Sequence, residues 1–137
     1  PRLVTVEVDA AHAAVAQNLL IHAGVAHEVD ILVGHSEDVL PWAASRLRRR
    51  GGRRAVDLVF LDQRGSRYLG DLSVLTKADV LGDGAVVVAD NVLKPGAPVF
   101  LWSVSSGSWD TQVFSLEEFA MPGVEDWVTV SRYRLPP

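Results

Sequence analysis

Three side chains that carry oxygen ligands stand directly after two apolar runs of the sequence. Asp62 follows the run at 58–61, and Asp90 with Asn91 follows the run at 86–89. If both runs are parallel strands, their carboxyl ends lie at one edge of a sheet, where ligands bind in α/β folds. Two carboxylates and an amide are donors that Mg²⁺ and Ca²⁺ prefer. Asp and Asn are also favoured at helix N-caps, so a metal site and two simple caps are both open interpretations.

Two further polar residues stand where the chain turns from a strand into a helix. Glu7 ends an apolar run, and in nucleotide-binding folds an acid at this place accepts hydrogen bonds from ribose hydroxyls. The alternative for Glu7 is a solvated acid at a strand end. His35 lies in a similar turn and is a candidate cofactor contact. A zinc site is not expected, because the four histidines of the chain lack the spacing that would place two of them on one helical face.

Composition limits the class of protein. The chain has 137 residues, 48% of them hydrophobic and 22% charged, with a net charge of −4 and no cysteine. We therefore expect one domain, residues 1–137, without disulfides and without nucleic acid as a partner. No apolar stretch reaches the about 20 residues needed for a transmembrane helix. We expect a soluble protein, cytoplasmic or organellar. An arginine tract at 46, 48–50 and 53–54 is expected to solvate a helix end rather than to bind phosphates.

Apolar patterning and helix caps predict an alternation of strands and helices. The pattern indicates strands at 3–8, 29–33, 56–61 and 85–89, and helices at 10–23, 36–49 and 68–81, with a turn at 82–84. A short helix is predicted to open at 95–98 and run to Trp102, and two antiparallel strands at 109–116 and 127–133. Asp9 and Ser36 are predicted N-caps, and Gly24 a C-terminal cap. These elements indicate an α/β fold with a mostly parallel sheet.

The order and spacing of several stretches resemble the catechol O-methyltransferase family, a family of class I methyltransferases that use Mg²⁺ and S-adenosylmethionine. The most specific stretches are 57–62, 67–69 and 89–98, supported by 4–7 and 34–41. The resemblance covers nearly the whole chain. It implies a Rossmann-like methyltransferase sheet with a C-terminal antiparallel strand pair, and methyl transfer to a hydroxyl of a catechol or another phenol.

The resemblance also implies roles for individual residues. Asp62, Asp90 and Asn91 match the metal ligands, and Glu7 matches the acid on the cofactor ribose. Contacts with the cofactor adenine fall on Ser36, Glu37 and Gln63, and contacts with the substrate fall on Pro95 and on either Glu117 or Glu118.

The sequence departs from the family pattern in three places. Gly65 replaces the lysine that acts as general base, and Gln63 replaces a histidine that packs on the adenine, next to Arg64. The glycine-rich cofactor loop and the family's first strand are absent from this chain. That strand lies in the sheet centre, between the strands at 3–8 and 56–61. We therefore expect a chain that is not self-sufficient, with the central strand supplied by another segment or by a partner, or with a rearranged sheet.

These departures leave three functions open. The first is an O-methyltransferase acting on a small catechol or phenol. The second is a catalytically inactive remnant that serves as a structural subunit and binds protein partners in a larger complex. The third, weaker, function is a metal-binding or small-molecule-binding module without catalysis. Aromatic side chains are enriched at interfaces, although core positions are the expected place for most of the tryptophans: Trp42, Trp102, Trp109 and Trp127.

Overall fold

The computed structural model describes residues 2–51, 55–118 and 120–135 of the chain. These residues form two compact units, Pro1–Ala43 and Ala44–Pro137. Arg53 and Arg54 of the arginine tract lie outside the described residues, while Arg46, Arg48 and Arg49 lie in the last turns of a helix, as predicted.

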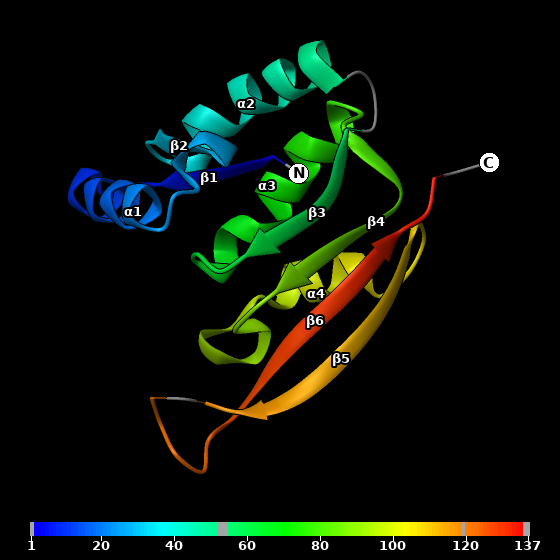
Figure 1. Cartoon of the computed structure of the whole chain (residues 1–137). Coiled ribbons are helices and arrows are strands. Elements are labelled where there is room, and N and C mark those ends of the chain that lie inside the picture. The colour runs from blue at the N-terminus through cyan, green and yellow to red at the C-terminus, as the bar shows by residue number, and fades with distance from the viewer. Residues whose placement is uncertain (1, 52–54, 119, 136–137) are drawn as a thin grey trace. The chain divides into compact units, whose positions relative to one another are not determined.

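The first unit contains a parallel strand pair (Figure 1). Its elements are β1 (Leu3–Glu7), α1 (Ala10–His22), the 3-10 turn η1 (Ala26–Glu28), β2 (Val29–Val33) and the start of α2 (Ser36–Gly51). The pair β1–β2 runs in register from Leu3 opposite Val29 to Glu7 opposite Val33. Asp9 caps α1 by accepting hydrogen bonds from the backbone N–H groups of residues 11 and 12. Gly24, at φ +76, ends the helix, so both predicted caps are confirmed.

In this unit the predicted apolar face of α1 was wrong in part, and the predicted N-cap of α2 was wrong by one residue. The predicted apolar face of α1 included Val15 and Leu19, but these side chains are 58% and 63% exposed. The less exposed side of the helix carries Ala13, Ala16 and Leu20, because small alanines let the helix approach β1 and β2 closely. Ser36 is the first residue of α2 and not its N-cap, since the carbonyl of residue 35 accepts the first hydrogen bond, from Val39.

The second unit is a four-stranded mixed sheet with order β3-β4-β6-β5. Strands β3 (Val56–Leu61) and β4 (Leu81–Ala89) are parallel, whereas β6 (Glu125–Tyr133) is antiparallel to both β4 and β5 (Trp109–Glu117). The connections are α3 (Gly65–Lys77), the irregular turn η2 (Val92–Gly96) and α4 (Pro98–Val104). The α/β class, the Rossmann-like order of elements and the C-terminal antiparallel pair are as predicted.

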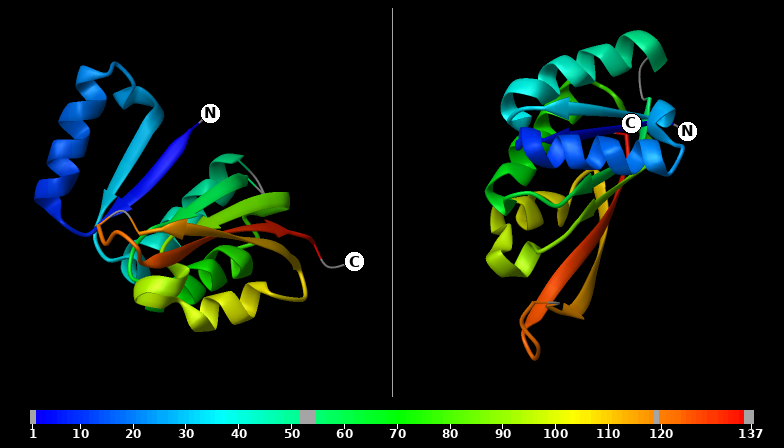
Figure 2. Two further views of the ribbon diagram at one scale, coloured as in Figure 1. Left: turned by 90° about the horizontal axis from the view of Figure 1, so that it is seen from below. Right: turned by 60° about the vertical axis from the view of Figure 1, so that its left-hand side comes forward.

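Helices α3 and α4 lie on the same face of this sheet (Figure 2). Between helices and sheet lies the core, in which the Tyr68 and Phe100 rings meet edge to face at 5.5 Å. Leu81 and Val87 of β4 complete this buried layer. On the opposite face of β3, Leu58 and Phe60 are 64% and 61% exposed. The expectation of core positions for most of the tryptophans was wrong. Trp102 on α4 is 83% exposed and Trp42 is 48% exposed, and Trp109 and Trp127 are only partly buried.

Several helix and strand boundaries in the second unit differ from the predicted ones. Residues 82–84 were predicted as a turn but belong to β4, because Leu81 already pairs with Val56 of the parallel neighbour. Helix α3 begins at Gly65 and ends at Lys77, three to four residues earlier than predicted at each end. The turns η1 and η2 had no counterpart in the prediction.

Each sheet has a strand with a single neighbour. Among the described residues, β1 pairs only with β2 and β3 pairs only with β4. These are the two strands between which the family's first strand was expected. That the chain needs a further strand, and that residues 1–137 act as one domain, stay predictions.

Candidate functional site

Asp62 and Asp90 stand at the carboxyl ends of neighbouring parallel strands. Leu61 of β3 pairs with Ala89 of β4, and each aspartate is the next residue along its strand. The backbone N–H of Asp90 donates a 2.9 Å hydrogen bond to the carbonyl of Leu61, which ties the two ends together. The structure therefore brings these two sequence-predicted residues side by side at one sheet edge.

Asn91 completes the predicted donor set in an unusual backbone conformation. Its φ of 53° and ψ of 36° are left-handed, a region that Asn tolerates better than most residues. Its backbone N–H donates to Oδ1 of Asp90 at 2.8 Å. Its side-chain Nδ2 donates at 2.7 Å to Asp126 and lies 3.5 Å from an oxygen of Glu118. The nitrogen end of the amide is thus held by carboxylates.

The two aspartates form a cluster of negative charge that suits a cation. Partial burial raises the pKa of the Asp62 carboxyl, and the neighbouring charge of Asp90 raises it further. A divalent cation would relieve this repulsion, and oxygen donors of this kind fit Mg²⁺ or Ca²⁺. Among the described residues, no three His, Cys, Asp or Glu side chains gather in a way that could hold a metal. The predicted donor set instead combines two carboxylates with the amide of Asn91.

Tyr68 of α3 is hydrogen-bonded to the backbone at this edge of the sheet. Its side chain is fully buried, and its hydroxyl donates a 2.9 Å hydrogen bond to the carbonyl of Asp90. Burial raises the pKa of Tyr68 to about 12, helped by the charges of Asp62, Asp90 and Asp126. The hydroxyl therefore keeps its proton and remains a donor at neutral pH.

Asp126, at the start of β6, is a residue that the sequence interpretation missed. It is only 4% exposed. Its Oδ1 accepts hydrogen bonds from three backbone N–H groups, those of Leu93, Lys94 and Trp127, at 3.2, 2.9 and 2.7 Å. Burial raises its pKa, but these bonds and the bond from Asn91 together outweigh burial and lower the pKa. The predicted strand began at residue 127, which left Asp126 in the preceding loop, where an acid gives no distinctive sequence signal.

An open hollow of about 520 Å³ lies beside these residues. Glu118 reaches the hollow, whereas the carboxylate of Glu117 accepts a 2.7 Å hydrogen bond from the N–H of Gly123 within its own turn. The residues that line the hollow are Asn91, Lys94, Pro95, Glu118 and Met121. Of the predicted substrate contacts, Pro95 and Glu118 are therefore placed together.

The loop after Asp62 differs in character from the other predicted site residues. The side-chain amide of Gln63, predicted to contact the cofactor, donates a 2.7 Å hydrogen bond to Asp71, a buried acid of α3. Gly65 begins α3 and carries no side chain. A Cβ atom added there would overlap the carbonyl oxygen of Gly96 in η2. The backbone of Gly96 therefore occupies the place where the first side-chain atom of any other residue at position 65 would lie.

The remaining predicted cofactor residues belong to the first unit. The Glu7 carboxylate accepts a 2.8 Å hydrogen bond from the N–H of Asp9, in the turn between β1 and α1. Ser36 and Glu37 form the first turn of α2, after Gly34 and His35. Gly34 has a φ of +143, and a Cβ there would come within 2.7 Å of Val39. Glycine is therefore required where β2 turns into α2.

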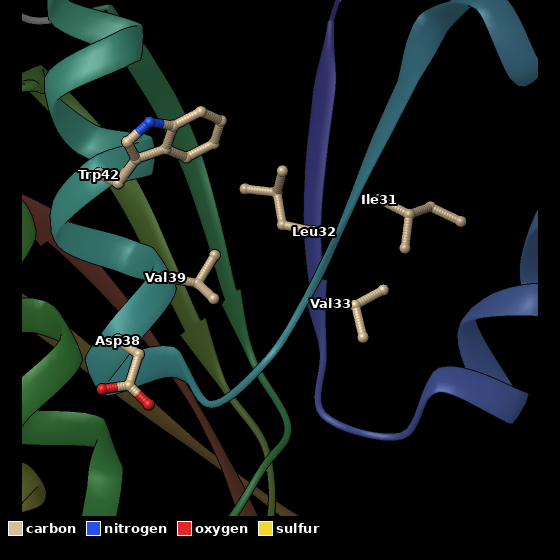
Figure 3. Close-up of a pocket in the computed structure, with 6 residues that line it drawn as sticks. All are labelled: Ile31, Leu32, Val33, Asp38, Val39 and Trp42. Carbon is tan, nitrogen blue, oxygen red and sulfur yellow. The ribbon is translucent and has the colours of Figure 1, made fainter.

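A second hollow, of about 380 Å³, lies between β2 and the first turns of α2. Figure 3 shows Leu32 pointing toward Val39 and Trp42, whereas Ile31 and Val33 point to the other side of the strand. Asp38 is the one charged residue of its lining. The lining of this hollow is mostly apolar, and an apolar lining of this kind could contact a flat ring system.

The fold is that of class I methyltransferases. The structure of the O-methyltransferase TomG from Streptomyces achromogenes, solved with S-adenosylmethionine, superposes with a TM-score of 0.80 at 27% identity, over 98% of this chain and 62% of TomG. The family profile for O-methyltransferases matches residues 1–105. The chain belongs to the O-methyltransferase family, in the group that resembles catechol O-methyltransferase.

Two curated relatives illustrate this placement. Catechol O-methyltransferase of Mus musculus is 39% identical over 107 residues, which are 78% of this chain and 39% of that protein. Transmembrane O-methyltransferase of Homo sapiens is 39% identical over 137 residues, 98% of this chain and 46% of that protein. The chain thus spans less than half the length of these two relatives. In the described part of this chain, every helix is too short or too polar to cross a bilayer.

Proposed function

We propose that this chain contributes to a Mg²⁺-dependent transfer of a methyl group from S-adenosylmethionine to a hydroxyl of a catechol or related phenol. The observation that carries the proposal is the pair of carboxylates, Asp62 and Asp90, at adjacent strand ends, with Asn91 beside them. The family relationship supports the choice of reaction. TomG, which has S-adenosylmethionine bound, supports the choice of methyl donor.

The residues of the second unit divide the work between metal and substrate. Asp62, Asp90 and Asn91 would hold Mg²⁺, which when bound supplies the positive charge that lowers the pKa of a substrate hydroxyl. Pro95, Glu118 and the rest of the hollow would bind the aromatic ring and fix its direction. Holding the two reactants in the right orientation is the main contribution that a protein makes to such a transfer.

In the first unit, Glu7, Ser36 and Glu37 are the proposed contacts to the methyl donor. Glu7 would accept hydrogen bonds from ribose hydroxyls, with its position fixed by the N–H of Asp9. The first turn of α2 and the apolar lining near Val39 and Trp42 would contact the adenine. Gln63 of the second unit is proposed as a further contact with the methyl donor.

Gly65 lowers the rate of methyl transfer that we expect, because it provides no general base. A glycine has no side chain that could accept the proton of the attacking hydroxyl, and the guanidinium of the neighbouring Arg64 makes a poor base. A positioned base typically accelerates a reaction by about 10²- to 10⁴-fold. We therefore expect slow methyl transfer that depends strongly on the metal.

The same glycine favours a second candidate function, a catalytically inactive remnant that acts as a structural subunit. Backbone fills the place of a side chain at residue 65, and β1 and β3 each lack a second neighbour among the described residues. In this case a protein partner would cover the free strand edges. The isolated chain would then associate or precipitate instead of binding S-adenosylmethionine.

The two functions are separated by titrating S-adenosylmethionine into the purified, folded chain with Mg²⁺ present, followed by a methyl-transfer assay. The first function predicts saturable binding and methylation of catechol that EDTA abolishes, with phenol a poorer substrate. Asp62→Asn should abolish the Mg²⁺-dependent methylation. Asp57→Asn, the same change on the exposed surface of β3, is the matched control and should leave it intact. A folded chain that binds no S-adenosylmethionine would favour the structural subunit.

A further inference from the structure

The side-chain amide of Asn91 has two chemically different ends, and only its oxygen is able to bind a metal ion. In the structure Nδ2 lies 2.7 Å from Oδ2 of Asp126 and 3.5 Å from Oε2 of Glu118. A carboxylate accepts hydrogen bonds and donates none. The nitrogen end must therefore face Asp126, which leaves the amide oxygen turned away from the two acids.

Asp126 is itself fixed in place from several sides. It is buried in the strand pair β5–β6, where it stands opposite Leu116. While Oδ2 accepts from Asn91, Oδ1 accepts from the backbone N–H groups of Leu93 and Lys94 in the turn that follows Asn91. One carboxylate thus holds both the amide of Asn91 and the backbone of the turn that comes after it.

We propose that Asp126 is a positioning residue that selects the orientation of the Asn91 amide and so makes its oxygen available to the cation. The inference rests on the proposed function, because the cation is part of that proposal. Outer residues that orient a metal ligand typically change metal affinity by about 10- to 100-fold when they are replaced. We expect an effect of this size at residue 126.

An exchange of the two polar groups tests this inference. In Asp126→Asn, the remaining Oδ1 is needed by the backbone N–H groups, so Nδ2 of the new amide faces Nδ2 of Asn91. The two donors conflict, and Mg²⁺ affinity should fall about 10- to 100-fold. The double variant Asn91→Asp with Asp126→Asn restores one donor and one acceptor at unchanged net charge, and should recover affinity to within about threefold of the original. Asp126→Asn with unchanged affinity, or a double variant no better than it, would overturn the inference.

Affinity is read from the rise in the thermal midpoint with Mg²⁺ concentration, which needs no catalytic activity. Asp57→Asn controls for the lost charge, and Glu118→Gln controls for the longer 3.5 Å contact and should have the smaller effect. If the original chain binds no Mg²⁺ at all, the metal part of the proposed function fails. Binding by the original chain together with an unaffected Asp126→Asn would sink the inference alone.

A measurement on the unaltered chain covers the case in which Asp126→Asn does not fold. In the metal-free protein, the side-chain NH₂ of Asn91 should exchange slowly with solvent in amide NMR spectra, because it is bonded to a buried carboxylate. An Asn91 side-chain amide that exchanges as fast as that of exposed Asn18 would contradict the orientation on which the inference depends.

Discussion

Gly65 lies so close to Gly96 that a Cβ atom on residue 65 would overlap the carbonyl oxygen of residue 96. Gly96 ends the turn that begins next to Asn91, so the start of α3 packs backbone to backbone on the turn that follows the candidate metal ligands. The local packing thus favours glycine at residue 65, where the resemblance implies a lysine in the family. A lysine at residue 65 would require the turn to move.

The first prediction concerns this contact. Gly65→Ala should lower the free energy of unfolding by about 1–3 kcal/mol, because the added methyl group overpacks a site bounded by backbone. Gly70→Ala is the matched control, since it lies in the same helix with no atom within 4 Å of the added Cβ. That substitution should raise stability by about 0.5–1 kcal/mol. Urea titration of both variants decides, and a neutral Gly65→Ala would contradict the packing.

Tyr68→Phe should lower the free energy of unfolding by about 1 kcal/mol, because the part-buried carbonyl of Asp90 loses the hydrogen bond from the Tyr68 hydroxyl. The ring contact with Phe100 is kept, so the hydroxyl alone is tested. Tyr133→Phe serves as control, since the Tyr133 hydroxyl donates no hydrogen bond within the described part of the chain. Equal losses in the two variants would argue against a supporting role for Tyr68.

A substitution at Thr129 of β6 is expected to stabilise the protein instead of destabilising it. Its side chain is fully buried, and its Oγ1 finds no hydrogen-bond partner among the described residues. Thr129→Val should therefore raise the free energy of unfolding, by about 1 kcal/mol. Ser131→Ala, two residues along the same face, should lower it by a similar amount, because Ser131 accepts a 2.9 Å hydrogen bond from Thr111. Thermal denaturation that ranks the two variants the other way would count against this assignment.

The cap of α1 should make stability depend on pH. Hydrogen bonds from the N–H groups of Ala11 and His12 lower the pKa of Asp9 from its ordinary value of 3.8. A lowered pKa means that the cap contributes fully above the ordinary value and that its contribution is lost as pH falls through the folded-state pKa. In Asp9→Asn the cap remains but no longer titrates.

The measurement compares the original chain with Asp9→Asn by circular dichroism at a series of pH values. The difference in helix melting between the two proteins should be constant above pH 5 or so and should shift in favour of the asparagine variant below about pH 4. A difference that stays constant through the acid range would show that Asp9 does not cap α1 in solution.

Features set by neighbouring residues were predictable from the sequence. The Asp9 cap and the Gly24 terminus depend on local backbone geometry, and both were found where predicted. The meeting of Asp62 with Asp90 was also predictable, since parallel strands bring their carboxyl ends to one edge. Adjacency of strands β3 and β4 therefore suffices to place these two acids.

Features set by contacts between distant segments were not predictable in this way. Asp126 is 35 residues from Asn91 along the chain, and its role depends on which strand pairs with β4. The crowding at Gly65 likewise depends on the path of η2. The packed face of α1 was misjudged at Val15 and Leu19, which are exposed, whereas its less exposed side is formed by Ala13, Ala16 and Leu20.

The order of strands in the sheet also has a consequence for synthesis. Strand β6 comes after β5 in the chain but lies next to β4 in the sheet, and it carries Asp126. A nascent chain that has emerged only as far as Asn91 holds the three proposed metal ligands but lacks Asp126, the carboxylate proposed to orient the Asn91 amide. Because the bond from Asn91 to Asp126 requires this distant pairing, the proposed orientation of the amide would be reached only when β6 has left the ribosome.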